Sequence, residues 1–532
     1  MSFATRISVS QEPKRFDANL QKIGFWATIA LIAVLQIWLH HDVTDRFFVA
    51  IQDFEELEFA KTETMPDPWG AFTRPHQGFG YRPLGDLLRA GNVAMTAGDP
   101  GLLLLRTIVF HSLLIGMVII LGKIVTGSPL VGALIGLVWA FHPTHMSQLG
   151  VPMWGAGVGS MILPIMVLLA FMVEDRKPHP RLLVSILMLI ALLTPWLYEG
   201  FLWIVPVFSC WIGLLVYRRY LAKSDLWLIL LPIVSLVAYF IMRMSVHDLA
   251  TQLLEAAPTS NYGLKPFGVI AQNIVMHQYA TAMRLDHLFF IAPLVETVTL
   301  GGGNRGVLVS LGLGLGFAAF VYAGALFLLV RQGFKLMWRL LAMLVLYWTS
   351  VSIFMLVTDT TEMYVYLSSI FWYIFAIGVI AKLIGELFTS GSKRRIFAWM
   401  LAVLALVPGS VAGTQYRIGA LEMKGALVAD QVTSAREWAA ESEGLPLTLI
   451  LDCDIPTGFS IYGKTRFAWW GTGPFRRWAL GQQGDSLNLF RAPDVVIGDI
   501  LMLSGSVAFL TRGGEFIEDE VELTRLVEGC AR

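Results

Sequence analysis

Residues 102–121 read LLLLRTIVFHSLLIGMVIIL, and Arg106 is the only Lys, Arg, Asp or Glu in this run. A helix needs about 20 mainly apolar residues to cross the hydrocarbon core of a bilayer. Comparable runs recur along most of the 532-residue chain, which is 56% hydrophobic and 15% charged. Such a composition is too apolar for a soluble protein. The sequence therefore predicts a polytopic α-helical membrane protein.

Window hydropathy predicts about eleven spans. They lie near residues 23–40, 102–124, 128–143, 151–173, 182–198, 199–217, 226–245, 306–330, 338–357, 364–385 and 397–412. If these helices alternate in direction, the groups of Lys and Arg before the first span and after the fourth, sixth, eighth and tenth fall on one side. The positive-inside rule makes that side cytoplasmic. The N-terminal segment 1–22 is then cytoplasmic, and no cleavable signal peptide is expected.

This topology predicts a transmembrane module over 23–412, with long outer loops at 41–101 and 246–305. Residues 267–300 mix apolar and polar side chains, which is typical of helices that lie in the membrane interface or dip into it. Residues 413–532 form an outer domain with a helical start, LEMKGALVADQVTSAREWAAE. The strand-like runs LPLTLILDCDIP, DVVIGDILML and SVAFL follow, so we expect a small α/β fold there.

Cysteine usage leaves one question open. Cys453 and Cys530 both lie in the expected outer domain, where an oxidising compartment would permit a disulfide. Sequence alone does not bring them within bonding distance.

Polar side chains cluster at the outer ends of the predicted spans, although polar groups are costly to bury in lipid. The set comprises Asp53 with Glu55 and Glu56, Arg82, His111, His142 and His145, Glu199, Arg284, and Glu362 with Tyr364. In one bundle these side chains would line a common cavity that holds a basic carboxylate and phosphate-binding cations. That combination suits transfer of a group from a phosphate-activated, lipid-soluble donor. Taken singly, each residue is equally compatible with a solvated surface group or a helix cap. The 39 cations and 39 anions balance, so no nucleic-acid partner is expected.

Several of these residues occur in an ordered set of motifs. The motifs are Gln52-Asp53-Phe54, Tyr81-Arg82-Pro83-Leu84, His111, His142-Pro143-Thr144-His145, Tyr198-Glu199-Gly200 and EMYVYLSS over 362–369. Their order resembles polytopic glycosyltransferases of the GT-C superfamily, in the bacterial and TMTC-like branch related to protein O-mannosyltransferases. The resemblance covers about residues 24–385. Gln52 and Met363 depart from the family pattern, which has an acid and an arginine there.

The resemblance implies a polyprenyl-phosphate-linked sugar donor and a catalytic aspartate in the first outer loop. Asp53 is the candidate base, with Glu55 and Glu56 beside it, and it would act on a hydroxyl of an acceptor protein, lipid or glycan. The donor phosphate would be bound by Arg82, Arg284, His145 and His142. The cavity would be lined further by Tyr81, His111, Glu199, Glu362 and Tyr364. The implied location is the bacterial inner (plasma) membrane, with the C-terminal domain periplasmic. A divalent Mg or Mn ion is compatible with the acids, although no residue spacing requires one.

Three other interpretations stay open. A flippase or transporter for lipid-linked sugars would place charges or Gly/Pro breaks at mid-span depth, whereas most charges here lie at span ends, with Arg106 as the plainest exception. A polysaccharide ligase or polymerase would use arginines of a large late outer loop, where this chain has only Arg284 and Arg305. The third is a catalytically degenerate GT-C relative that acts as an assembly subunit.

Overall fold

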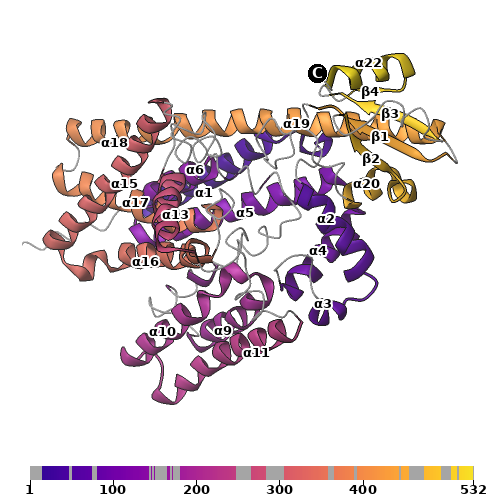
Figure 1. Ribbon diagram of the computed structural model, residues 1–532. Helices are drawn as coiled ribbons and strands as arrows, with labels where there is room; N and C mark the ends of the chain where they lie inside the picture. Colours follow the sequence, from indigo (N-terminus) through magenta and orange to yellow (C-terminus); the bar gives the residue numbers. More distant parts are fainter. Residues whose placement is uncertain are drawn as a thin grey trace, which may run out of the picture.

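The computed structural model describes residues 15–46, 51–74, 81–142, 145, 149, 165–167, 171, 180–246, 265–282, 305–357, 365–388, 392–442, 445–453, 473–492, 505–511 and 515–530. A bundle of apolar helices makes up the larger part (Figure 1). One long helix, α19, runs along this bundle to a small domain with a β-sheet at the C-terminal end of the chain (Figure 1).

Ten helices of the described residues form the bundle together with α13 (Phe267–Ala282), which is described below. They are α1 (Arg15–Leu39), α5 (Pro100–Thr126), α6 (Pro129–Ala140), α9 (Pro180–Leu197), α10 (Ile204–Tyr217), α11 (Leu230–Val246), α15 (Arg305–Gln332), α16 (Phe334–Val357), α17 (Val365–Leu387) and α18 (Lys393–Leu406). Short 3-10 segments precede α10 and α11, at Glu199–Phe201 and Lys223–Ile229.

Five stretches of the described chain are helical, long enough and apolar enough to cross a membrane. These are Pro100–Thr126, Lys223–Val246, Gly312–Gln332, Phe334–Ser352 and Val365–Leu387. Shorter apolar helices cover Trp26–Leu39, Pro129–Ala140, Leu182–Leu197 and Ile204–Tyr217. The architecture is therefore that of a helical membrane protein, while the count of eleven spans stays a prediction. The expected span 151–173 lies largely outside the described residues, and the expected span 397–412 is divided between α18 and α19 at Val407.

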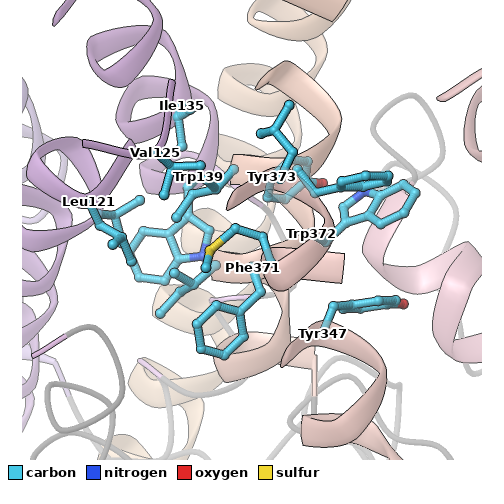
Figure 2. Close-up of a cluster of buried hydrophobic side chains, with 14 of the residues drawn as sticks. Leu121, Val125, Ile135, Trp139, Tyr347, Phe371, Trp372 and Tyr373 are labelled. Carbon is cyan, nitrogen blue, oxygen red and sulfur yellow. The ribbon is translucent and has the colours of Figure 1, made fainter. Parts of the chain in front are cut away.

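Helix α17 is the central element of the bundle, since most of its side chains from Val365 to Ile384 are buried. It packs against α5, α6, α13, α15 and α16. Figure 2 shows part of the shared core: Leu121 and Val125 from α5, Ile135 and Trp139 from α6, Tyr347 from α16, and Phe371, Trp372 and Tyr373 from α17. Because lipid is as apolar as these side chains, close packing is what holds such helices together.

Two glycines bring α6 against α5. A Cβ on Gly132 would lie 2.7 Å from the backbone oxygen of Ile119 and 2.7 Å from the backbone nitrogen of Lys123. A Cβ on Gly136 would lie 2.0 Å from Cγ1 of Ile119. Gly132 and Gly136 form a G-x-x-x-G pair, a spacing that permits close backbone approach between membrane helices.

The polar stretch between α1 and α5 folds into short helices. They are a 3-10 turn at Val43–Asp45, α2 (Ile51–Phe59), a π-helical turn at Ala60–Thr64, α3 (Gly70–Thr73) and α4 (Pro83–Thr96). Pro83 and Pro100 occupy the first positions of α4 and α5, where a missing N–H costs nothing. The Asp99 side chain caps α5 by accepting the N–H of Leu102 at 2.8 Å.

Helix α13 (Phe267–Ala282) differs from the expected interfacial helix, because its second half is buried in the bundle. Its polar side chains have partners there. Asn273 donates to the carbonyl of Met355 at 3.2 Å, and Gln278 accepts from the Tyr322 hydroxyl at 2.9 Å. These bonds offset part of the cost of burying amides among apolar helices.

The C-terminal region begins with α19 (Pro408–Glu441), a continuous helix that contains the expected domain boundary at residue 413. A four-stranded sheet follows, in the order β2-β1-β3-β4, with β1 parallel to both neighbours and β4 antiparallel to β3. The strands are β1 (Leu447–Leu451), β2 (Asn488–Arg491), β3 (Ser506–Leu510) and β4 (Phe516–Ile517), and the helices are α20 (Gly473–Leu480), a 3-10 turn at Gly481–Gly484, and α22 (Glu520–Cys530). β1 and β3 fall on two of the strand-like runs, whereas the run 494–503 lies outside the described residues. The outer-face position of this domain stays a prediction.

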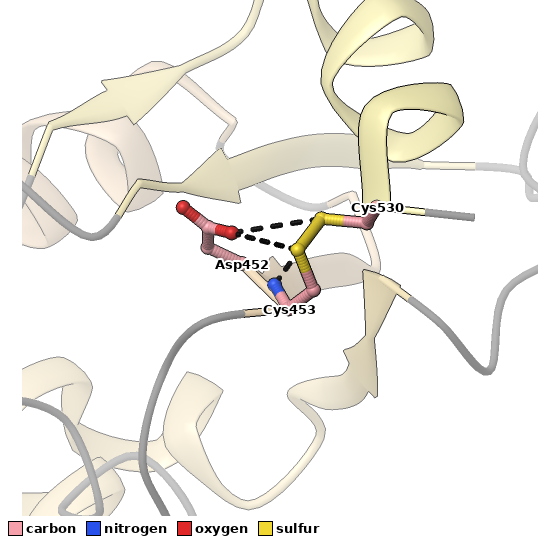
Figure 3. Close-up of a disulfide and its surroundings, with 3 residues drawn as sticks. All are labelled: Asp452, Cys453 and Cys530. Atoms are coloured by element: carbon pink, nitrogen blue, oxygen red, sulfur yellow. Dashed lines mark hydrogen bonds between the residues drawn. A yellow bond between two sulfur atoms is a disulfide. The ribbon is translucent and has the colours of Figure 1, made fainter. Parts of the chain in front are cut away.

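A disulfide between Cys453 and Cys530 links the end of β1 to the end of α22 (Figure 3). Their Cα atoms are 5.5 Å apart, within the range that a disulfide requires. The Cys453 N–H donates to Cys530 Sγ at 3.3 Å. The pairing that the sequence left open is thus present, and it is typical of an oxidising compartment.

Removal of this disulfide should destabilise the C-terminal domain. The bond joins residues 77 positions apart and restricts the unfolded chain, so the double variant Cys453→Ser/Cys530→Ser should lose about 2–4 kcal/mol of unfolding free energy. The purified protein is incubated at increasing urea concentrations and then digested briefly with a protease. The urea concentration at which the C-terminal domain becomes cleavable measures this change. The control is Cys210→Ser, which replaces the free cysteine of α10 and should leave the domain unchanged. Equal resistance of the double variant and the wild type would contradict the expectation.

Candidate active site

Asp53 lies in the first turn of α2 and is fully buried, with 0% of its surface exposed. It is close enough to Arg106, in the second turn of α5, for direct electrostatic attraction. A buried carboxylate needs a compensating charge, and Arg106 supplies it. The one charge that interrupts the apolar run 102–121 therefore sits beside the candidate base.

Glu56, one turn further along α2, has a structural partner. It forms an ion pair with Arg89 of α4, which also pairs with Asp86 at 2.6 Å. Arg89 and Asp86 are both buried. Because breaking a buried pair leaves an uncompensated charge, this triad holds α2 against α4. The sequence predicted that Glu56 assists the catalytic base. In the structure, the Glu56 carboxylate forms an ion pair with Arg89.

Glu55 is half-buried on α2, next to Glu56 in the chain. Burial raises the pKa of its carboxyl, and the charges of Glu56 and Glu58 raise it further. Glu55 is therefore an acid whose ionised form is disfavoured by its surroundings.

The face of α2 that carries Phe54 packs against the C-terminal domain. Phe54 is fully buried and lies edge-on to Phe475 of α20 at a centroid distance of 4.9 Å, with Trp478 at 5.1 Å. Glu58 forms an ion pair with Arg477 of the same helix. These residues belong to a core that includes Leu57, Val93 and Leu103 from the membrane side and Val428, Leu449 and Ala508 from the domain. Helix α2 is thus enclosed between two parts of the protein.

Tyr81 and Arg82 connect α4 to α9 and α11. Tyr81 is buried, its hydroxyl donates to the carbonyl of Phe72 at 2.9 Å, and its own carbonyl accepts from the Tyr239 hydroxyl at 3.1 Å. Burial, and then the charge of Asp86, raises the pKa of Tyr81 to about 12, so it stays protonated at neutral pH. The Arg82 guanidinium lies 4.8 Å from the centre of the Tyr198 ring, a cation–π contact beside position 199.

The predicted histidines come together at the first turns of α17. His111 Nδ1 is 2.8 Å from the Tyr366 hydroxyl, and His145 Nε2 is 3.1 Å from the Ser369 hydroxyl, which also accepts from Trp139 Nε1 at 2.9 Å. His142 and His145 are fully buried, with ring centres 5.0 Å apart. His111 and His145 have ring centres 5.8 Å apart. The three histidines therefore form one layer with α17.

A further histidine completes this layer from the other side. His277 of α13 is buried, and its Nε2 is 3.0 Å from the Ser368 hydroxyl. The next turn of α17 contributes Tyr373, whose hydroxyl donates to the carbonyl of Thr281 at 2.5 Å. Tyr366, Ser368 and Ser369 belong to the late motif 362–369, so the motif supplied part of this layer. The roles of Trp139 and Tyr373 had no sequence signal beyond hydropathy.

Some predicted site residues cannot be located. Arg284, Glu362 and Tyr364 lie outside the described residues, as does the side chain of Glu199. The contributions of Arg89, Asp86 and Arg106 were missed by motif reasoning. One feature of the sequence pointed to a role for Arg106, namely that it is a charged residue inside an apolar span.

Neither a metal site nor the apolar cavity described next coincides with these residues. Within the described chain, one group of His, Cys, Asp and Glu has ligand atoms close enough for an ion, namely Asp452, Cys453 and Cys530, and its two sulfurs are joined in the disulfide. An apolar cavity of about 400 Å³ lies between α10 and α16, bordered by Trp203, Trp211 and Trp338, with Arg218 at its edge. None of the predicted site residues lines it.

The titration of Glu55 gives a pH-dependent stability. A raised pKa means that the folded protein binds this proton more tightly than the unfolded chain, so its contribution to stability is present at low pH and is lost as pH rises. Glu55→Gln should therefore unfold at a higher temperature than the wild type at pH 8, and the difference should disappear near pH 4. Thermal unfolding in detergent across this range measures it, with the exposed Glu437→Gln of α19 as control. An unchanged difference at both pH values would contradict the assignment.

The contact between α2 and α20 should matter for stability. Phe475→Ala would remove the ring that packs on Phe54, and loss of a buried Phe typically costs about 3–5 kcal/mol. We expect a matching loss of unfolding free energy and faster proteolysis of the C-terminal domain. Phe490→Ala, at an exposed phenylalanine of β2, is the matched control. Equal stability of the two variants would refute this anchoring.

Comparison of the chain with protein family models and with curated proteins identifies no relative. No protein family model matches the chain, and no curated protein is significantly similar to it.

Proposed function

We propose that this protein is a membrane glycosyltransferase of the GT-C type, which moves a sugar from a polyprenyl-phosphate donor to an acceptor hydroxyl at the outer face of the bacterial inner membrane. The observation that carries the proposal is Asp53, a fully buried carboxylate paired electrostatically with Arg106. His111 follows Arg106 by five residues on α5, a rise of about 7.5 Å. Helix α5 thus carries both the cation that attracts Asp53 and one histidine of the layer.

The transfer would proceed by direct displacement. The acceptor oxygen attacks the anomeric carbon, its proton passes to the Asp53 carboxylate, and the bond from the anomeric carbon to the phosphate oxygen breaks. The electron pair leaves with the polyprenyl phosphate, and the sugar carbon is inverted. Because Asp53 is enclosed, the acceptor would reach it only when neighbouring segments move apart. Their closure around the bound acceptor would then exclude water from the reaction.

The departing phosphate needs positive charge or hydrogen-bond donors. Arg106 is one candidate among the described cations, since it lies within electrostatic range of the Asp53 carboxylate. Arg82, at the start of α4, is a second candidate to bind the phosphate, and its guanidinium lies over the Tyr198 ring. His142 and His145, together with Arg284, remain candidates from the motif order. A divalent Mg or Mn ion is not part of this proposal, because the described acids of α2 are not among the groups whose ligand atoms lie close enough together for an ion.

The position of Arg106 favours a transferase over a flippase. A transporter would need its charges near the middle of the span. Arg106 is the exception among charges that otherwise lie at the ends of predicted spans, yet it lies in the second turn of the 27-residue α5 and not at its middle. A charge near a helix end, beside a buried acid, suits a reaction at one membrane face.

Asp53→Asn should abolish sugar transfer. General-base catalysis typically contributes about 10²–10⁴-fold, and asparagine keeps the shape of the side chain without the charge. We expect at least about a hundredfold loss of polyprenyl phosphate release. The assay uses the purified protein in lipid nanodiscs, with polyprenyl-phosphate mannose and glucose as probes and membranes of a gene-deleted host as acceptor.

The control is Asp67→Asn, an exposed acid of the same outer segment that pairs with Arg74. It should retain full activity. Thermal unfolding of both variants separates loss of catalysis from loss of folding. Full activity of a folded Asp53→Asn protein would refute the base, and absence of transfer by the wild type would favour the degenerate relative.

A further inference from the structure

One end of the bundle is rich in cations. The connections α5–α6, α15–α16 and α17–α18 meet there, and they carry Lys123, Arg331, Lys335, Arg339, Lys382, Lys393, Arg394 and Arg395. In the described residues 119–131, 328–343, 378–388 and 392–399, the single acid is Glu386, which pairs with Arg331 and with Gln332. The positive-inside rule assigns this end to the cytoplasm, opposite to Asp53.

A cavity of about 240 Å³ opens at this end. Two cations line it, Lys382 from α17 and Arg395 from α18, together with the hydroxyl-bearing residues Thr126 and Ser128 and the indole of Trp399. No carboxylate is among its described lining residues. Two cations with hydroxyls and no acid form a set that recognises an anion.

The two cations have no anionic partner in the described chain. Lys382 and Arg395 are both half-buried, and no ion pair joins either to a described acid. An ionisable residue inside a membrane helix is costly and usually has a partner. For Lys382 and Arg395 that partner is missing from the described protein, while the cavity between them is large enough to hold one.

The surroundings of the cavity indicate where this partner comes from. Leu130 lines the cavity and is 71% exposed, and Ile396, Phe397 and Met400 on α18 are also exposed. In a membrane protein such side chains face lipid tails. The cavity is smaller than the roughly 300–1,000 Å³ that encloses a whole drug-sized ligand, so it fits part of a larger molecule whose remainder lies in the bilayer.

We propose that this cavity binds the phosphodiester headgroup of an anionic membrane phospholipid, with Lys382 and Arg395 on the phosphate and Trp399 and Leu130 on the start of the acyl chains. The anionic cytoplasmic leaflet attracts basic residues of this kind. The site is independent of the sugar transfer proposed above, because it lies at the other end of the bundle.

The test is a lipid titration of the full-length protein in neutral detergent, followed by thermal unfolding. Phosphatidylglycerol should raise the unfolding temperature in a saturable manner, and phosphatidylcholine should not. Lys382→Gln/Arg395→Gln should weaken the apparent affinity for phosphatidylglycerol about tenfold or more, because two charge-assisted contacts are lost. Lys393→Gln/Arg394→Gln is the matched control, since it removes the same charge from exposed neighbours outside the cavity.

Each other outcome overturns the proposal. Equal stabilisation by phosphatidylcholine would mean that headgroup charge is not recognised. An equal loss in the control variant would mean that the bulk charge of this end, and not the cavity, attracts the lipid. A shift produced by inorganic phosphate alone would assign the cavity to a free anion.

A second measurement uses the wild type and does not depend on how the variants fold. Photoactivatable phosphatidylglycerol with the reactive group near its headgroup should label peptides that contain 126–131 or 395–399, as mapped by mass spectrometry. Labelling confined to other helices would overturn the site.

Discussion

The burial of α17 is the constraint on which the membrane bundle depends. Its polar side chains Tyr366, Ser368 and Ser369 lie where no water reaches them, so each must find a partner inside the protein. The partners come from three other segments: His111 on α5, His145 after α6, and His277 on α13. Since a hydroxyl and an imidazole pair only at hydrogen-bond distance, these contacts fix the depth at which the helices stand relative to one another.

Sequence patterns located the elements better than their contacts. Hydropathy found α5 and α17, and strand-like runs found β1 and β3, because periodicity is written in consecutive residues. The burial of α13 was not predicted, because polar residues such as Asn273 and His277 are typical of interfacial helices. Their partners, the carbonyl of Met355 and the hydroxyl of Ser368, lie far away in the sequence. The pairing of Glu56 with Arg89 was missed for the same reason: α2 carries four acids, and only the fold decides which cation each of them meets.

For the candidate site, sequence motifs collected residues from distant segments but did not rank them. They singled out Asp53, and they grouped His111, His142 and His145, which the structure brings into one layer. They gave no hint that Phe54 and Glu58 contact α20, more than 400 positions later in the chain. The helix that carries Asp53 is therefore held from both sides, by Arg89 of the membrane module and by Phe475 and Arg477 of the C-terminal domain.

Helix α19 has 34 residues and is therefore about 51 Å long. It is fastened near its start by the Thr414 hydroxyl, which donates to the carbonyl of Phe141 at 2.8 Å, and further along by Glu422, which pairs with Arg46 at 2.5 Å. Each residue inserted after Glu422 would advance the sheet by about 1.5 Å and rotate it by about 100°, so α20 would swing off α2. A seven-residue insertion, two full turns, would restore the rotation but would still advance the sheet by about 10.5 Å. The length of α19 beyond Glu422 therefore works as a molecular ruler, which sets the distance at which α20 meets α2.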